Sequence, residues 1–94
     1  MTVETVSFAS VFDALADTPE EAANLRARAE LARALVALVA SQGWTQTEAA
    51  RQCGVTQPRM NDLLRGRISR FSLDALVNMA AACGQQVHIA LQTA

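Results

Sequence analysis

Residues 45–63 combine two short helical patterns around a glycine, and this arrangement restricts the possible folds more than any other part of the chain. Thr45 and Glu48 have the spacing of a capping box, in which the threonine hydroxyl accepts from an unpaired backbone N–H and the glutamate reaches back to the cap. The helix that begins here can run only to Cys53, because Gly54 stands where a helix ends in the left-handed conformation. A short helix followed by a tight turn is therefore expected.

A second short helix is predicted directly after the turn. Thr56 is its expected N-cap, and Pro58 falls in its first turn, where the missing N–H removes no helical hydrogen bond. We expect this helix to end near Gly66. Small and apolar residues of the two helices and the turn point inward: Ala49, Ala50, Cys53, Val55, Met60 and Leu63. The pattern predicts two helices packed at a fixed crossing angle, with one face of the second helix left polar.

A longer helix is predicted on the N-terminal side of this pair. Thr18 is its expected N-cap, with Pro19 at the first helical position and Glu21 in a capping box. The helix should end near Gln42, just before a glycine. Trp44 follows, and we expect it to fill the core between the helices rather than to stack on a base.

A last helix is predicted toward the C-terminal end. Ser72 is its expected N-cap, and Phe71 and Leu76 stand at the two positions of a hydrophobic staple. The helix should stop at Gly84. The residues expected to close the core from this helix are Leu73, Leu76, Val77, Ala80 and Cys83.

The final residues have the period of a β-strand rather than that of a helix. In the segment 86–92, QVHIALQ, the apolar residues Val87, Ile89 and Leu91 alternate with residues that are mostly polar. A single strand cannot satisfy its own backbone, so we expect it to pair with the same segment of a second subunit in an antiparallel ribbon. Pairing with residues 2–8, TVETVSF, is the alternative, and the two arrangements can coexist.

Residues 25–84 resemble the lambda-repressor-like, Xre-type helix-turn-helix domain, and the run from Gly43 to Leu76 resembles its HigA-type antitoxin branch. The T-Q-x-E-A-A opening, the G-V-x-Q-P-R turn and the L-L-R-G ending carry the resemblance. It implies an all-α, lambda-repressor-like helix-turn-helix bundle of about four to five helices, with a C-terminal β-strand that pairs across a dimer. Three parts are expected, which are an apolar and acidic N-terminal arm over 1–17, the DNA-binding domain over 18–84 and a dimerisation strand over 85–94.

The resemblance implies that the second helix of the motif is a recognition helix, which reads the major groove of double-stranded DNA. Gln57 holds the family's main base-contacting position, and Arg59 and Asn61 suit guanine and adenine. Asp62 would be repelled by phosphates, so it accepts from cytosine, orients Arg59 or Arg65, or disfavours other sequences. Phosphate contacts are predicted for Thr45, Gln46, Thr56, Arg65, Arg67 and Arg70. Two recognition helices about 34 Å apart in a homodimer would read a palindromic operator.

The charge distribution fits this interpretation, although the formal net charge is only −1. Residues 1–30 contain six acids and two arginines, whereas residues 31–71 contain six arginines and two acids. All eight basic residues are arginine, which suits bidentate contact with phosphates and guanine, although a GC-rich coding bias would give the same preference. The sequence therefore separates an acidic N-terminal part from a basic part that contains the motif.

The acidic N-terminal arm is the candidate surface for a protein partner. In the family that the chain resembles, antitoxins neutralise a small basic RelE-like or HigB-like ribonuclease toxin and repress their own operon. By this analogy, toxin contacts are predicted for Phe8, Val11, Phe12, Asp13 and Asp17. Two alternatives stay open, which are a stand-alone Xre-type repressor without a toxin and a protein-interaction module that does not bind DNA.

Other functions find little support in the sequence. The single histidine, His88, has no acid, base or nucleophile at a motif spacing, so we expect no enzyme activity, no cofactor and no metal site. Cys53 and Cys83 have no histidine or cysteine nearby and are expected to be reduced thiols in the core. The most apolar stretch, LARALVALVA, is short and contains Arg33, and no signal peptide is recognised. We therefore expect a cytoplasmic protein without a membrane span.

Overall fold

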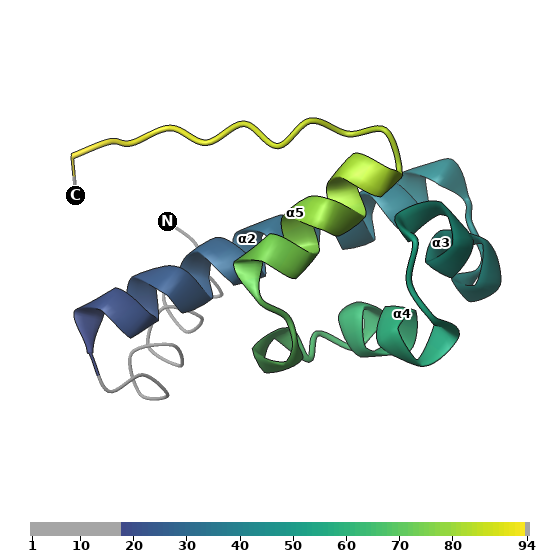
Figure 1. Cartoon of the computed structure of the whole chain (residues 1–94), viewed down its shortest axis with the longest axis horizontal. Coiled ribbons are helices and arrows are strands. Elements are labelled where there is room, and N and C mark those ends of the chain that lie inside the picture. Colours follow the sequence, from purple (N-terminus) through teal and green to yellow (C-terminus); the bar gives the residue numbers. More distant parts are fainter. Residues whose placement is uncertain (1–17, 94) are drawn as a thin grey trace.

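The computed structural model of the chain describes residues 18–93, and within these residues every regular element is helical (Figure 1). The elements are α2 (Pro19–Gln42), α3 (Gln46–Cys53), α4 (Gln57–Leu64), the short 3-10 helix η1 (Ile68–Arg70) and α5 (Leu73–Ala82). None of these helices combines the length and the apolar character that a membrane span requires. The predicted helical bundle is therefore confirmed over the described part of the chain.

Each α-helix begins at the hydroxyl residue that the sequence predicts as its cap. The backbone N–H three residues further on donates to the side chains of Thr18, Thr45, Thr56 and Ser72, over 3.1, 3.2, 3.3 and 3.1 Å. α3 ends at Cys53, and Gly54 follows with a φ of 69° in the left-handed region. α5 ends at Ala82, slightly before the predicted stop at Gly84. Local sequence signals thus set the helix boundaries.

Glu48 does not complete the capping box that its spacing predicts. Its carboxylate accepts from Arg51 Nε over 3.0 Å and from Gln52 Nε2 over 2.9 Å, toward the C-terminal end of α3. Hydrogen bonds from these partners, Arg51 first, lower the pKa of Glu48 from 4.5 to about 2. The prediction that Glu48 reaches back to Thr45 is therefore wrong, because a cation one turn away attracts the carboxylate more strongly than a neutral N–H does.

We expect the Glu48 carboxyl to titrate near pH 2 in the folded protein. Because its folded-state pKa lies below 4.5, Glu48 stabilises the fold fully above about pH 4.5 and loses that contribution as the pH falls toward 2. Carboxyl chemical shifts measured by NMR against pH test this. Arg51→Ala should raise the midpoint toward 4.5, whereas Arg65→Ala, at the residue that follows α4, should leave it unchanged. A wild-type midpoint near 4.5 would show that the ion pair does not form in solution.

The hydrophobic core forms where α2, α3, α4 and α5 meet. Its buried residues are Ala32, Leu35, Val39, Ala49, Ala50, Cys53, Met60, Leu63, Phe71, Leu76, Met79 and Ala80. Val55 is half-buried against this cluster, and so is Trp44, which packs on the core as the sequence predicts. The shared core therefore fixes the two short helices to the two longer ones.

Cys53 and Cys83 lie closer together than the sequence suggests. Both are free thiols, and the helix ends that carry them meet, since a Cβ on Gly54 would lie 3.7 Å from the Cβ of Ala82. Burial raises the pKa of the Cys53 thiol to about 11, and the neighbouring Cys83 adds to this rise. The expectation that neither thiol has a cysteine neighbour is therefore wrong, although the raised pKa keeps Cys53 protonated near neutral pH.

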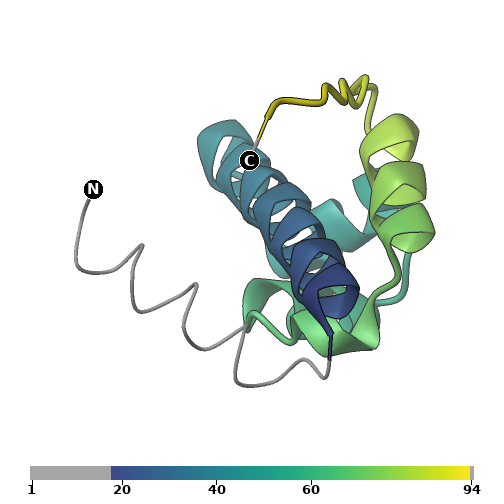
Figure 2. The ribbon, with the colours of Figure 1, turned by 90° about the vertical axis from the view of Figure 1, so that its left-hand side faces the viewer.

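The C-terminal segment, residues 83–93, leaves α5 and runs back over the side of the domain opposite α4 (Figures 1 and 2). Gln85 N donates to Ala80 O over 2.9 Å, and residues 86–93 form no backbone–backbone hydrogen bond within the described chain. The predicted strand thus has no partner in a single described chain, and its pairing across a dimer stays a prediction. Residues 2–8, the alternative partner, lie outside the described residues, as do the predicted toxin contacts Phe8, Val11, Phe12, Asp13 and Asp17.

Candidate nucleic-acid interface

α4 presents the polar face that the sequence predicts. Met60 and Leu63 are 0% and 2% exposed and hold α4 against the core. On the other side of the helix, Gln57 and Pro58 are exposed and Asn61 is half-buried. One side of α4 is thus an exposed polar surface on a rigid support.

The N-terminal ends of α3 and α4 lie next to each other. Gln46 Nε2 donates to Gln57 O over 3.4 Å, so the first residues of the two helices are in contact. Both ends carry N–H groups without helical partners, and the helix dipoles favour an anion there. The hydroxyls of Thr45 and Thr56 accept from the helix backbone, which leaves their own hydrogens free to donate to a phosphate. The structure therefore brings these four predicted contact residues together at one edge.

Arg59 does not point outward from this face. Its guanidinium lies over the Phe71 ring, 4.1 Å from the ring centroid, and its Nη1 donates to Arg70 O over 2.7 Å. Arg59 therefore connects α4 to the residues just before α5. To contact a base, its guanidinium would have to leave both partners, so the structure favours a supporting role for Arg59 over the predicted base contact.

Asp62 is occupied by two arginines of the segment that follows α4. Its Oδ1 accepts from Arg67 Nη1 over 3.0 Å and from Arg70 Nη1 over 2.9 Å. These contacts, with the hydrogen bond from Arg67 first, hold the pKa of Asp62 below its ordinary value. Of the three roles expected for Asp62, the orientation of Arg59 or Arg65 is wrong, because the chain beyond α4 folds back and brings a different pair of arginines to the carboxylate. The contact with cytosine and the selection against other sequences stay predictions.

Asn61 and Arg65 are paired with each other on the surface of α4. Arg65 Nε donates to Asn61 Oδ1 over 3.3 Å across one helical turn. A bidentate contact with adenine uses both the oxygen and the nitrogen of an asparagine amide. Asn61 can therefore make its predicted base contact only when the Arg65 side chain turns away, for instance toward a phosphate.

Two residues outside the motif support the interface, and the sequence does not predict this role for them. Phe71 is 1% exposed and carries Arg59 on its ring. Arg28 on α2 donates from Nη1 to Phe71 O over 3.1 Å, which ties the same residue to the long helix. The sequence identifies Phe71 only as part of a hydrophobic staple, and nothing in the spacing of Arg28 indicates that it contacts Phe71.

The family described as helix-turn-helix domain matches residues 14–92 of the chain. This range includes α2, α3, α4 and α5 and most of the C-terminal segment. No curated protein matches the chain. The family match and the arrangement of α3, its turn and α4 therefore indicate the same motif.

Proposed function

This chain belongs to the helix-turn-helix domain family, and we propose that it is a sequence-specific transcriptional repressor that binds a palindromic operator as a homodimer. Membership of the family supports a DNA-binding regulator. The observation that carries the finer proposal is the contact between Gln46 and Gln57, which places the exposed starts of two helices side by side. A phosphate at the start of α3 and a base at the start of α4 would then be bound by adjacent residues.

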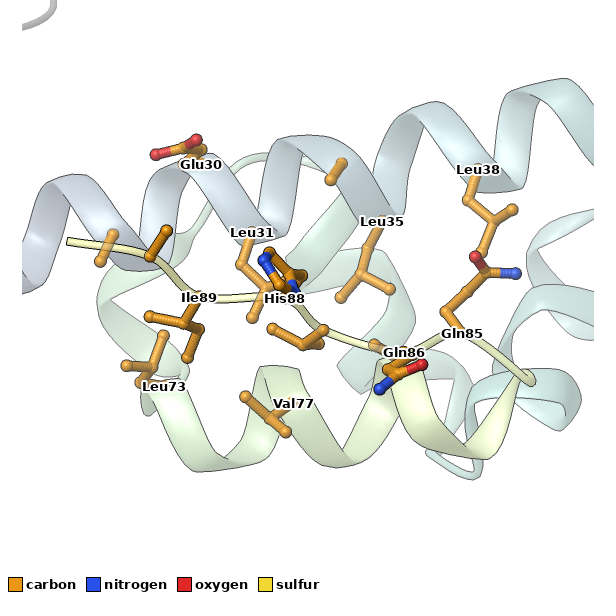
Figure 3. A pocket seen from close by; sticks show the side chains of 15 residues that line it. Glu30, Leu31, Leu35, Leu38, Leu73, Val77, Gln85, Gln86, His88 and Ile89 are labelled. Atoms are coloured by element: carbon orange, nitrogen blue, oxygen red, sulfur yellow. The ribbon is translucent and has the colours of Figure 1, made fainter. Parts of the chain in front are cut away.

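The exposed C-terminal segment supports the homodimer. Figure 3 shows the segment between α2 and α5, where Val87 is half-buried against the core. Further along, Ile89 and Leu91 are 73% and 99% exposed, and the backbone of residues 86–93 is not hydrogen-bonded to any other described backbone group. The same segment of a second copy, aligned antiparallel, would cover the apolar side chains and pair the backbone groups.

Pairing through this segment is compatible with DNA reading by two helices. The segment and α4 lie on opposite sides of the domain (Figures 1 and 2). In the proposed dimer, two C-terminal segments pair edge to edge, and the two-fold axis is perpendicular to the two-stranded ribbon that they form. Both domains then lie on the same side of this ribbon, so both α4 helices would face one duplex. The two helices would then read the two halves of an inverted repeat.

Gln57→Ala is expected to remove most of the preference for the operator while leaving the domain folded. Gln57 is exposed at the start of α4, and losing its bidentate base contact costs about 1–3 kcal/mol of discrimination in each half-site. Gel shifts with the DNA upstream of the gene and with a scrambled duplex of equal length measure this preference. Gln42→Ala, which removes the same side chain from the exposed end of α2, should change nothing. A full preference retained in Gln57→Ala would show that α4 reads DNA with other residues.

We also propose that the repressor is an antitoxin, which binds a small basic RelE-like or HigB-like ribonuclease. The resemblance of residues 43–76 to the HigA-type branch supports this, as do the six acids among residues 1–30, which complement a basic partner. A stand-alone repressor is the alternative. Co-expression with the adjacent reading frame separates the two, since co-purification of a small basic protein supports the antitoxin and the lack of such a neighbouring gene contradicts it.

A further inference from the structure

We propose that Asp62 sets the sequence selectivity of DNA binding by holding Arg67 and Arg70 as one fixed pair of phosphate-binding groups. This role rests on the proposed DNA-binding function, within which Asp62 acts through the two arginines and not through a base. Asp62 is therefore a positioning residue, and its effect is measured by the ratio of the affinities for the operator and for unrelated DNA.

Three hydrogen bonds tie the segment after α4 to Asp62. Its Oδ1 accepts from Arg67 Nη1 over 3.0 Å and from Arg70 Nη1 over 2.9 Å, and its carbonyl oxygen accepts from Arg67 N over 3.0 Å. Arg59 holds the main chain of Arg70 by donating to its carbonyl oxygen over 2.7 Å. The guanidiniums of Arg67 and Arg70 are therefore neighbours at one oxygen, and α4 fixes the position of both.

The two arginines keep most of their donors available. A guanidinium carries five N–H donors, and each arginine uses its Nη1 for the bond to Asp62. The side chains of Arg67 and Arg70 are 42% and 57% exposed, whereas the side chain of Asp62 is 16% exposed. The arginines thus cover the carboxylate, and a phosphate that approaches this end of α4 meets guanidinium groups first.

The carboxylate of Asp62 has two effects on DNA binding, and the first of them favours the correct site. First, the carboxylate fixes the side chains of Arg67 and Arg70 before DNA binds, so these side chains lose less rotamer freedom on binding. This raises the affinity only for a duplex whose phosphates match the fixed positions of the two arginines. Second, the carboxylate offsets one positive charge of the interface, which weakens the attraction to every duplex. The first effect raises the affinity for the operator relative to the affinity for unrelated DNA, whereas the second lowers both affinities alike.

Asp62→Asn and Asp62→Ala test this role in the full chain. Asparagine keeps an acceptor of similar shape without the charge, and alanine removes both. We expect binding to a scrambled duplex to tighten and the operator-to-scrambled ratio to fall, about fivefold for Asp62→Asn and about tenfold for Asp62→Ala. The salt dependence of binding should steepen by about one phosphate contact per protomer. Anisotropy titrations at several salt concentrations measure both, with a duplex selected from a random library by the wild-type protein as the operator.

Glu30→Gln is the matched control, because it removes one negative charge from an exposed position on α2, near the C-terminal segment. It should leave the ratio at the wild-type value, and thermal unfolding verifies that all variants are folded. An unchanged ratio in both Asp62 variants, or an equal fall in Glu30→Gln, would overturn the role of Asp62 and leave the proposed DNA binding intact. A wild-type protein that selects no sequence from the library would contradict the proposed function, and the role of Asp62 with it.

Discussion

Ile89→Glu is expected to convert the proposed dimer into monomers and to lower the affinity for the operator by about a hundredfold or more. Ile89 is 73% exposed in the single chain, so the substitution should leave the fold of the protomer intact. In the paired ribbon it would place two carboxylates among the apolar side chains of the two segments. Without pairing, each molecule carries one recognition helix, which reads only half of the palindrome.

Sedimentation velocity measures the assembly, and a gel-shift titration measures the binding of the Ile89→Glu protein. Gln92→Glu is the matched control, because it introduces the same charge in the same segment on the alternate face of the predicted strand. We expect this control to remain dimeric and to bind the operator normally. A dimer that survives Ile89→Glu would show that a different surface joins the protomers.

Phe71→Ala is expected to lower the free energy of unfolding by about 3–5 kcal/mol. Phe71 is 1% exposed and is one of the largest fully buried side chains of the described chain. Its removal leaves a cavity in the core and withdraws the ring over which the Arg59 guanidinium lies. Because Arg59 also holds the carbonyl oxygen of Arg70, the affinity of the folded fraction for the operator should fall as well.

Urea unfolding followed by circular dichroism measures the stability of Phe71→Ala. Phe71→Leu separates packing from stacking, because leucine refills much of the cavity but offers no ring face to Arg59. We expect Phe71→Leu to recover most of the stability and little of the operator affinity. A loss below about 1 kcal/mol in Phe71→Ala would contradict the position of Phe71 at the centre of the core.

The helices of this fold could be predicted from the sequence because their signals are local. The caps Thr18, Thr45, Thr56 and Ser72 act within three residues, and Gly54 ends α3 through its own backbone conformation. Between these boundaries, the spacing of the apolar residues identifies the side chains that point inward. The other side chains of α4 form its polar face. A bundle with an exposed second motif helix follows from these signals alone.

The contacts within the interface could not be predicted in this way, because they join residues on either side of a change in chain direction. Arg59 meets Phe71 only after the segment beyond α4 folds back. The chemistry of Asp62 allows three roles, one of which is to orient an arginine, and helical spacing suggests Arg59 or Arg65 as that arginine. The partners of Asp62, Arg67 and Arg70, lie beyond the end of α4, where spacing carries no information about position.

In the proposed homodimer, the contact between the two protomers and the DNA-reading helix α4 would lie on different surfaces, because the C-terminal segment is on the side opposite α4 (Figure 1). A molecule that covered the segment would therefore change operator occupancy without touching a base or a phosphate. It would act by mass action, since it would withdraw protomers from the monomer–dimer equilibrium. Where most of the protein is monomeric, halving the free protomer lowers the dimer about fourfold. A small change in the amount of free protein would thus become a larger change in transcription.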